Sequence, residues 1–113
     1  MPVRVELVEP AFEDLVRYSR SGNIKLFLAK LLHIEEHGQN AGRPLGKGLS
    51  GWQKTVVGDR DWRIIFRMNA TGTVATIWAI GDRADAECYA EAERRIRALG
   101  KSNPIATGTP SVL

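Results

Sequence analysis

The residues whose types could do chemistry lie on a predicted hairpin and just after it: Lys54, Arg63 and Arg67, then Arg83 and Tyr89. A guanidinium group forms paired hydrogen bonds that match phosphate oxygens, and it stabilises negative charge that develops at phosphorus. Lysine and tyrosine have ordinary pKa values of about 10, so either is a poor base at neutral pH unless its surroundings change that value. Neighbouring cations can lower the pKa of either group. These residue types could therefore bind phosphate or move a proton, and they leave the acid and the base unassigned.

Alternation along residues 62–68 indicates which of these cations share a surface. Apolar residues alternate there with Arg63 and Arg67, which predicts a half-buried strand with both arginines, and Ile65 between them, on its open face. With an even number of residues in the preceding turn, Lys54 and Val56 lie on that same face. Mutual repulsion of three cations is relieved when an anionic backbone binds between them. A merely solvated sheet face is the alternative. The expected core residues of the strand are Trp62, Ile64, Phe66 and Met68.

Positive charge is concentrated in the segment that holds these residues. The net charge of the chain is +3, and residues 43–83 contain seven basic and three acidic side chains. Residues 1–42 sum to −1 and residues 84–113 to zero. A local excess of this kind indicates a partner that carries phosphates or many carboxylates. The further cations expected to contact such a partner are Arg43, Lys47, Arg60 and Arg67.

Arg83 follows a predicted strand, and Tyr89 lies six residues later on the last predicted helix. Near the strand end, both side chains could reach the basic face. The alternative is that Tyr89 anchors the apolar stripe of its helix and that Arg83 is a surface charge near Asp82 or Asp85. Without the basic hairpin, this alternative would be preferred.

Two short segments match the residue patterns of known binding sites, but their predicted structural context does not fit those sites. Residues 46–51 satisfy G-x-G-x-x-G, but they follow a loop and enter a strand, whereas a dinucleotide site needs a strand before and a helix after. Residues 33–37 satisfy the H-x-x-E-H pattern of some zinc peptidases. Both His33 and His37 lie on the polar side of a helix end, where the helix dipole favours histidine anyway. We expect no cofactor and no metal site.

The helices are predicted from apolar spacing and from their end signals. A short helix begins near Pro10 and ends before residues 21–22, and a longer helix runs from Asn23 to about Gly38. A third runs over residues 85–99 and stops at Gly100. Their predicted apolar stripes are Phe12, Leu15 and Val16, then Ile24, Phe27, Leu28, Leu31 and Ile34, then Tyr89, Ala92, Ile96 and Leu99.

The strands are predicted at residues 3–8, 52–57, 62–68 and 73–80, with residues 39–51 as a loop. The order β-α-α-β-β-β-α predicts an α+β fold with a mostly antiparallel four-stranded sheet and helices packed on one face. The 113 residues and the apolar content of 43% suit one domain over residues 1–100, followed by a flexible tail over residues 101–113.

Cysteine content and the N-terminal pattern bear on location. Cys88 is the lone cysteine, which suits a reducing compartment. The first residues alternate charged and apolar side chains, and no apolar run reaches the ~18 residues of a membrane span. We therefore expect a cytoplasmic protein with no membrane partner.

From about Val3 to Leu99, the sequence resembles the RelE/ParE toxin superfamily of bacterial type II toxin–antitoxin systems. The motifs are fairly specific together and weak singly. They are Arg43-Pro44-Leu45, Leu49-Ser50-Gly51-Trp52, the run from Val57 to Arg67 that reads VGDRDWRIIFR, Ala79-Ile80-Gly81-Asp82-Arg83, and Tyr89-Ala90-Glu91-Ala92.

The resemblance implies a metal-independent endoribonuclease, or mRNA interferase, that cleaves mRNA on the ribosome, inhibits translation and arrests growth. It implies a separate antitoxin protein as partner, along with mRNA and the ribosome, and no small-molecule cofactor. By position, the catalytic set falls on Lys54, Arg63, Arg83 and Tyr89. A second strand lysine of some RelE members would fall at Val56. The implied RNA-binding residues are Arg43, Lys47, Arg60 and Arg67.

The implied chemistry is attack of a ribose 2′-OH on the adjacent phosphorus, which yields a cyclic phosphate and a free 5′-OH. Base stacking is an alternative role for Tyr89. Two other functions stay open: a ParE-like inhibitor of DNA gyrase without nuclease chemistry, and a non-toxic basic nucleic-acid-binding domain.

Overall fold

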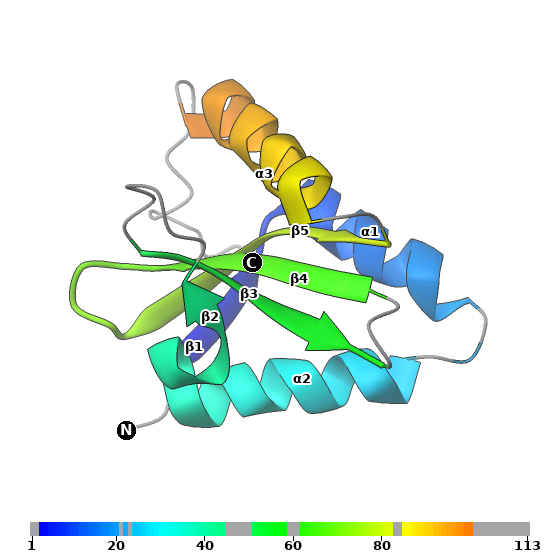
Figure 1. Cartoon of the computed structure of the whole chain (residues 1–113), viewed down its shortest axis with the longest axis horizontal. Coiled ribbons are helices and arrows are strands. Elements are labelled where there is room, and N and C mark those ends of the chain that lie inside the picture. The colour runs from blue at the N-terminus through cyan, green and yellow to red at the C-terminus, as the bar shows by residue number, and fades with distance from the viewer. Residues whose placement is uncertain are drawn as a thin grey trace.

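The computed structural model describes residues 3–20, 22, 24–44, 51–58, 62–82 and 85–100. Within this part of the chain, helices and strands follow one another in an α+β arrangement, as predicted (Figure 1). The predicted strands and helices are confirmed to within about a residue at most ends. The elements are β1 (Arg4–Leu7), α1 (Glu9–Ser19), α2 (Ile24–His37), the 3₁₀ turn η1 (Gly38–Ala41), β2 (Arg43–Pro44), β3 (Trp52–Val57), β4 (Trp62–Met68), β5 (Val74–Gly81) and α3 (Asp85–Gly100).

The described strands form one sheet in the order β1-β5-β4-β3-β2. The N-terminal strand β1 runs parallel to β5, and every other neighbouring pair is antiparallel. The sheet has five strands where four were predicted, because Arg43 and Pro44 pair with β3 inside the predicted loop. Gly42 permits this close approach, since a Cβ there would lie 2.6 Å from the carbonyl oxygen of Lys54.

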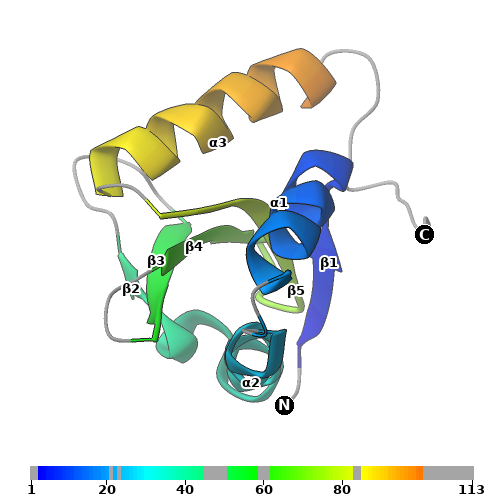
Figure 2. The ribbon, with the colours of Figure 1, turned by 90° about the vertical axis from the view of Figure 1, so that its right-hand side faces the viewer.

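Helices cover both faces of the sheet, so the prediction that they pack on one face is wrong in this respect. Figure 2 shows α2 below the sheet and α3 above it. On the α2 side, Phe27 contacts Trp62 at a ring-centroid distance of 5.3 Å. On the α3 side, Tyr89 contacts Trp52 at 5.5 Å. Ile65, which was placed on the open face, is fully buried, so this face is not open to solvent at the middle of β4.

Each of the first two helices buries a narrower stripe than its spacing predicted. Phe12 and Val16 of α1 and Leu28 of α2 are exposed by 55%, 40% and 46%. Leu15 is buried as predicted, and the other buried positions of α1 are Ala11 and Asp14. The apolar spacing identified the helices, but it did not indicate which residues of each apolar stripe would be buried against the sheet.

The edge of β5 beyond β1 is completed by side chains of helices. Pairing between β1 and β5 ends at Leu7 opposite Ile77. Past that point, the Ile80 backbone N–H donates to Asp14 Oδ2 at 3.0 Å, and the Trp78 carbonyl accepts from Arg95 Nη1 at 3.0 Å. These contacts satisfy polar backbone groups that would otherwise be buried without partners.

Candidate functional site

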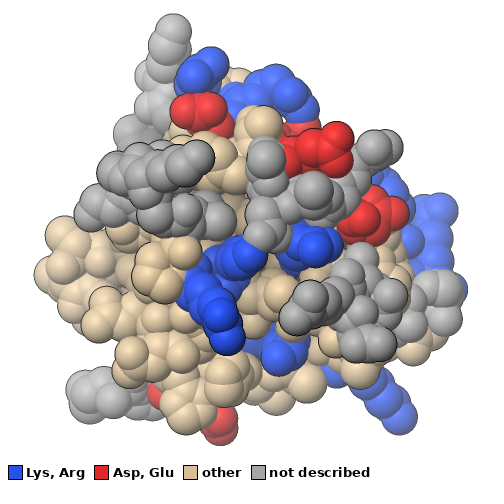
Figure 3. Space-filling model, in the orientation of Figure 1, with Lys and Arg blue, Asp and Glu red and all other residues tan. Residues whose placement is uncertain are grey.

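Four cations lie on the sheet face that also carries α3, and we call this set the basic face: Arg43, Lys54, Arg63 and Arg67. Register places them together. Arg43 is opposite Lys54 across β2 and β3, and Val56 is opposite Arg63 across β3 and β4. Lys54 is opposite Ile65, which lies between the two arginines of β4. The prediction that Lys54 and both arginines share one face is therefore confirmed, and Figure 3 shows a group of Lys and Arg side chains near the middle of the view.

The cations of the basic face differ in exposure. Arg43 and Arg67 are exposed, whereas Lys54 and Arg63 are half-buried. A half-buried arginine has fewer rotamers open to it before it meets a ligand, so Arg63 is better suited than the exposed arginines to hold a phosphate in one geometry. The half-buried Val56 stands directly opposite Arg63, so the position across from this arginine is apolar.

Tyr89 reaches this face from α3. Its ring meets the indole of Trp52 edge-on, with an interplanar angle of 88°. Burial raises the pKa of Tyr89, Glu93 adds to the rise, and Arg67 and Arg97 oppose it. The expectation that clustered cations lower the pKa of this phenol is therefore wrong, because burial outweighs them. At neutral pH Tyr89 keeps its proton and can donate it, or a hydrogen bond, to a substrate oxygen.

Trp52 was not foreseen as part of the site, although it has the strand parity of Lys54. It is only 6% exposed, and the guanidinium carbon of Arg67 lies 5.4 Å from its ring centroid. Trp78, the extra residue at the bulge between β4 and β5, lies 6.3 Å away. The sequence could have indicated Trp52 only through the strand register, which places it directly opposite Arg67.

Several predicted residues lie outside the described part of the chain. These are Lys47, Arg60 and Arg83, together with the rest of the glycine-containing motif at residues 46–50 and the tail at residues 101–113. The residue before Arg83 is described: Asp82 accepts a hydrogen bond from the Tyr18 hydroxyl at 3.4 Å. Of the predicted catalytic set, the structure thus places Lys54, Arg63 and Tyr89 around one surface.

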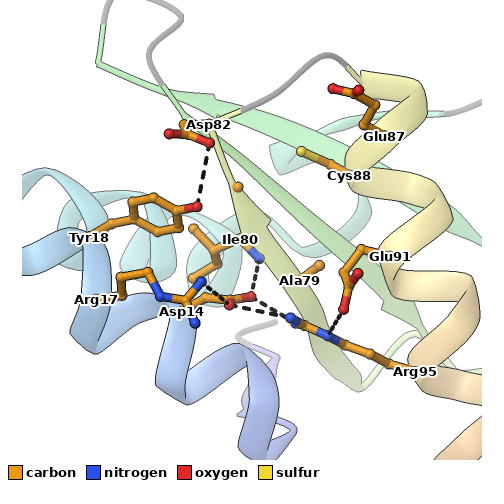
Figure 4. Close-up of a pocket in the computed structure, with 11 residues that line it drawn as sticks. Asp14, Arg17, Tyr18, Ala79, Ile80, Asp82, Glu87, Cys88, Glu91 and Arg95 are labelled. Carbon is orange, nitrogen blue, oxygen red and sulfur yellow. Dashed lines mark hydrogen bonds and ion pairs between the residues drawn. The ribbon is translucent and has the colours of Figure 1, made fainter.

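A polar pocket of about 350 Å³ lies between α1, α3 and the end of β5 (Figure 4). At its base, Arg95 Nη1 donates to Asp14 Oδ2 at 2.7 Å, and Arg17 approaches the same carboxylate at 3.6 Å. The carboxylates of Glu87 and Glu91 also line it. Because acidic groups outnumber basic ones along its walls, this pocket is unsuited to phosphate and is distinct in chemistry from the basic face.

Among the described residues, no cluster of three or more His, Cys, Asp or Glu side chains has a metal-binding arrangement. His33 and His37 lie with ring centroids 4.6 Å apart on the exposed end of α2. None of the described helices is both long and apolar enough to span a membrane.

Comparison with known proteins gives a likeness of fold. No protein-family profile and no curated protein sequence match the chain. Escherichia coli toxin RelE in the free state, solved as a mutant, aligns with a TM-score of 0.67 at 21% identity, over 85% of this chain and 99% of that one. A chain of the toxin–antitoxin complex RelBE2 from Mycobacterium tuberculosis aligns with a TM-score of 0.61 at 19% identity, over 74% and 100%. The archaeal RelE–RelB complex from Pyrococcus horikoshii gives 0.52 at 18% identity, over 75% and 99%. The molecule has the fold of these toxins.

Proposed function

We propose that this chain, which has the fold of RelE toxins, is the toxin of a type II toxin–antitoxin system that cleaves mRNA on the ribosome and thereby inhibits translation. The observation that carries the proposal is the basic face with Tyr89 at its border. Cations spaced along two adjacent strands suit successive phosphates of a single strand, and an aromatic ring beside them suits an unstacked base or its ribose.

The proposed reaction is an intramolecular transesterification, in which the phosphorus of one RNA phosphodiester moves from the 5′-oxygen to the neighbouring ribose 2′-oxygen. The 2′-oxygen loses its proton and attacks phosphorus, the bond from phosphorus to the 5′-oxygen breaks, and that oxygen takes up a proton. The products are a 2′,3′-cyclic phosphate and a 5′-OH. No oxidant, reductant or metal is needed for the atoms to balance.

In this proposal, each residue has a role that suits its surroundings. Arg63, held half-buried in β4, binds the phosphate and stabilises the charge that develops on it, together with Arg83. Lys54, which lies on the same face in the neighbouring strand, adds positive charge beside the phosphate. The raised pKa of Tyr89 favours a protonated phenol, which suits donation toward the leaving 5′-oxygen better than proton abstraction. Arg43, Lys47, Arg60 and Arg67 bind flanking phosphates.

A separate antitoxin protein is the proposed physiological partner. An acidic segment could neutralise the basic face, and apolar side chains could cover exposed residues such as Phe12 and Val16 of α1. Binding of this kind would compete directly with RNA for Arg63 and Lys54. Co-expression with the cognate antitoxin should then restore growth.

The test compares induced expression of the wild type with expression of Arg63→Ala and of Arg4→Ala. Arg4 is a matched control because it lies on β1, away from the basic face, in a surface ion pair with Glu6 at 2.9 Å. We expect wild type and Arg4→Ala to arrest growth and to cut mRNA when ribosomes are supplied, leaving cyclic phosphate and 5′-OH ends. Arg63→Ala should lose about 10²-fold or more in cleavage rate. Intact RNA with wild type, together with undiminished toxicity of Arg63→Ala, would refute the proposal.

A ParE-like inhibitor of DNA gyrase is the second candidate, favoured by one observation: the apolar Val56 opposite Arg63 leaves the face one cation short of some RelE members. That function predicts DNA damage and filamentation while protein synthesis continues. A non-toxic nucleic-acid-binding domain, in contrast, predicts harmless expression. Pulse labelling of protein synthesis in the first minutes after induction separates the three.

A further inference from the structure

The indole of Trp52 touches three side chains from three different elements. It stands opposite Arg67 in the register of β3 and β4, and its ring lies under the Arg67 guanidinium at 5.4 Å. It meets Tyr89 of α3 edge-on at 5.5 Å, and Trp78 of β5 at 6.3 Å. Trp52 itself is 6% exposed, so a bound substrate has little access to it.

We propose that Trp52 is a positioning residue, which holds the Tyr89 ring and the Arg67 guanidinium in a fixed relation on the border of the basic face. The expected effect of Trp52 on catalysis rests on the proposed function. Its expected effect on the position of Tyr89 rests on the geometry alone. Nothing in the proposed reaction requires Trp52 to contact RNA.

The physical basis is the electron distribution of the indole. Its face attracts the guanidinium of Arg67, which is exposed and would otherwise sample many rotamers. The edge-to-face arrangement with Tyr89 fixes the direction in which the phenol points, because aromatic pairs favour that geometry over a parallel sandwich. An aliphatic side chain could fill part of the volume, but it would supply neither interaction.

The bulge in β5 supports this arrangement. The register shifts between Ile65 and Phe66 so that Trp78 has no direct partner in β4. Trp78 is 5% exposed, and its ring packs beside the ring of Trp52. Charged groups around the phenol are Glu93 and Arg97 on α3 and Arg67 on β4. Loosening Trp52 should therefore change both the burial of Tyr89 and its separation from Arg67.

The test substitutes Trp52 and, as a matched control, Trp62, which packs on Phe27 on the opposite face of the sheet. The variants are Trp52→Leu, Trp52→Phe and Trp62→Leu, each in full-length protein with Tyr18→Phe so that Tyr89 gives the single tyrosine signal. NMR titration of ¹³C-labelled tyrosine then follows the phenol directly and needs no RNA. In Trp52→Leu the pKa of Tyr89 should fall toward its ordinary value, because burial is its largest cause. Trp62→Leu should leave it unchanged.

Kinetics supply the second readout. In ribosome-dependent cleavage, Trp52→Leu should lower kcat about tenfold or more and raise KM through the loosened Arg67, and Trp52→Phe should recover most of kcat. In a Tyr89→Phe background, Trp52→Leu should lower kcat less than about twofold further, because the hydroxyl group that Trp52 holds in place is already absent.

The proposal is overturned if Tyr89 titrates identically in wild type and Trp52→Leu, or if the two kcat losses multiply in the double variant. Should Trp52→Leu fail to fold, Trp52→Phe decides, since loss of the indole ring current must shift the Tyr89 resonances if the contact exists. Unshifted resonances would overturn it. If no RNA is cut by any variant, the proposed function fails, and the titration still judges the positioning of Tyr89.

Discussion

Arg63 and Gly81 are direct partners across β4 and β5, and the missing side chain of Gly81 lets α3 close over that pair. A Cβ built at Gly81 would lie 2.8 Å from the Sγ of Cys88, which is nearer than such contacts normally come. Tyr89 is the next residue of the helix. The glycine therefore sets how closely α3 approaches the sheet, and with it how close the phenol lies to the basic face.

Replacing Gly81 with alanine should displace the start of α3. Because the helix must move or Cys88 must change rotamer, we expect a loss of about 1–3 kcal/mol in the free energy of unfolding. Urea denaturation of Gly81→Ala, Cys88→Ala and the double variant measures the coupling. Cys88→Ala should restore part of the stability lost in Gly81→Ala. Strictly additive losses would show that the two residues do not interfere with each other.

The ion pair of Asp14 with Arg95 should be a main determinant of stability. Asp14 is 2% exposed and also accepts from the Ile80 backbone, so truncation to alanine leaves Arg95 and a strand N–H without their partner. We expect Asp14→Ala to lose about 3 kcal/mol in the free energy of unfolding.

A matched control for Asp14→Ala is Arg97→Ala, whose pair with Glu93 is at the surface with the Arg97 side chain 72% exposed. Surface pairs contribute little, so its thermal midpoint should stay close to that of the wild type. Equal losses in the two variants would contradict the importance assigned to the buried pair.

Alkaline pH should weaken the fold through Tyr89. Its pKa in the folded protein is raised above the value of 10.0 that it has when unperturbed, mainly by burial, so folding favours the neutral phenol. That contribution is fully present below pH 10 and is lost as the pH rises through the folded pKa. The free energy of unfolding should therefore fall more steeply above pH 10 in wild type than in Tyr89→Phe. Parallel curves for the two proteins would show that burial does not perturb the phenol.

RNA binding should depend on salt in proportion to the phosphates that the basic face contacts. With a short RNA made uncleavable by 2′-O-methylation, Arg67→Gln should weaken binding uniformly across sequences. It should also reduce the slope of log affinity against log salt by about 0.7 per phosphate contact. Fluorescence anisotropy at several salt concentrations measures both quantities. Lys25→Gln, an exposed cation on α2, is the control and should leave the slope unchanged.

Local pattern was enough to predict the hairpin that carries the basic face. The alternation of Arg63 and Arg67 with Ile64 and Phe66 fixes which side each occupies, because strand side chains point to opposite faces in turn. The even loop then carried Lys54 onto the same side, and the observed register agrees. The element order followed from the same kind of local signal.

Long-range packing decided the rest. Asp14 and Arg95 are 81 residues apart, and no spacing rule connects them. Contacts between distant segments decide the parallel pairing of β1 with β5, the bulge that brings Trp78 beside Trp52, and the packing of Tyr89 of α3 on Trp52 of β3. The sequence by itself thus determined the cations of the hairpin and their common face. Only the tertiary structure decided which aromatic groups hold Tyr89 there and that its pKa rises, because burial is a property of packed elements and not of local spacing.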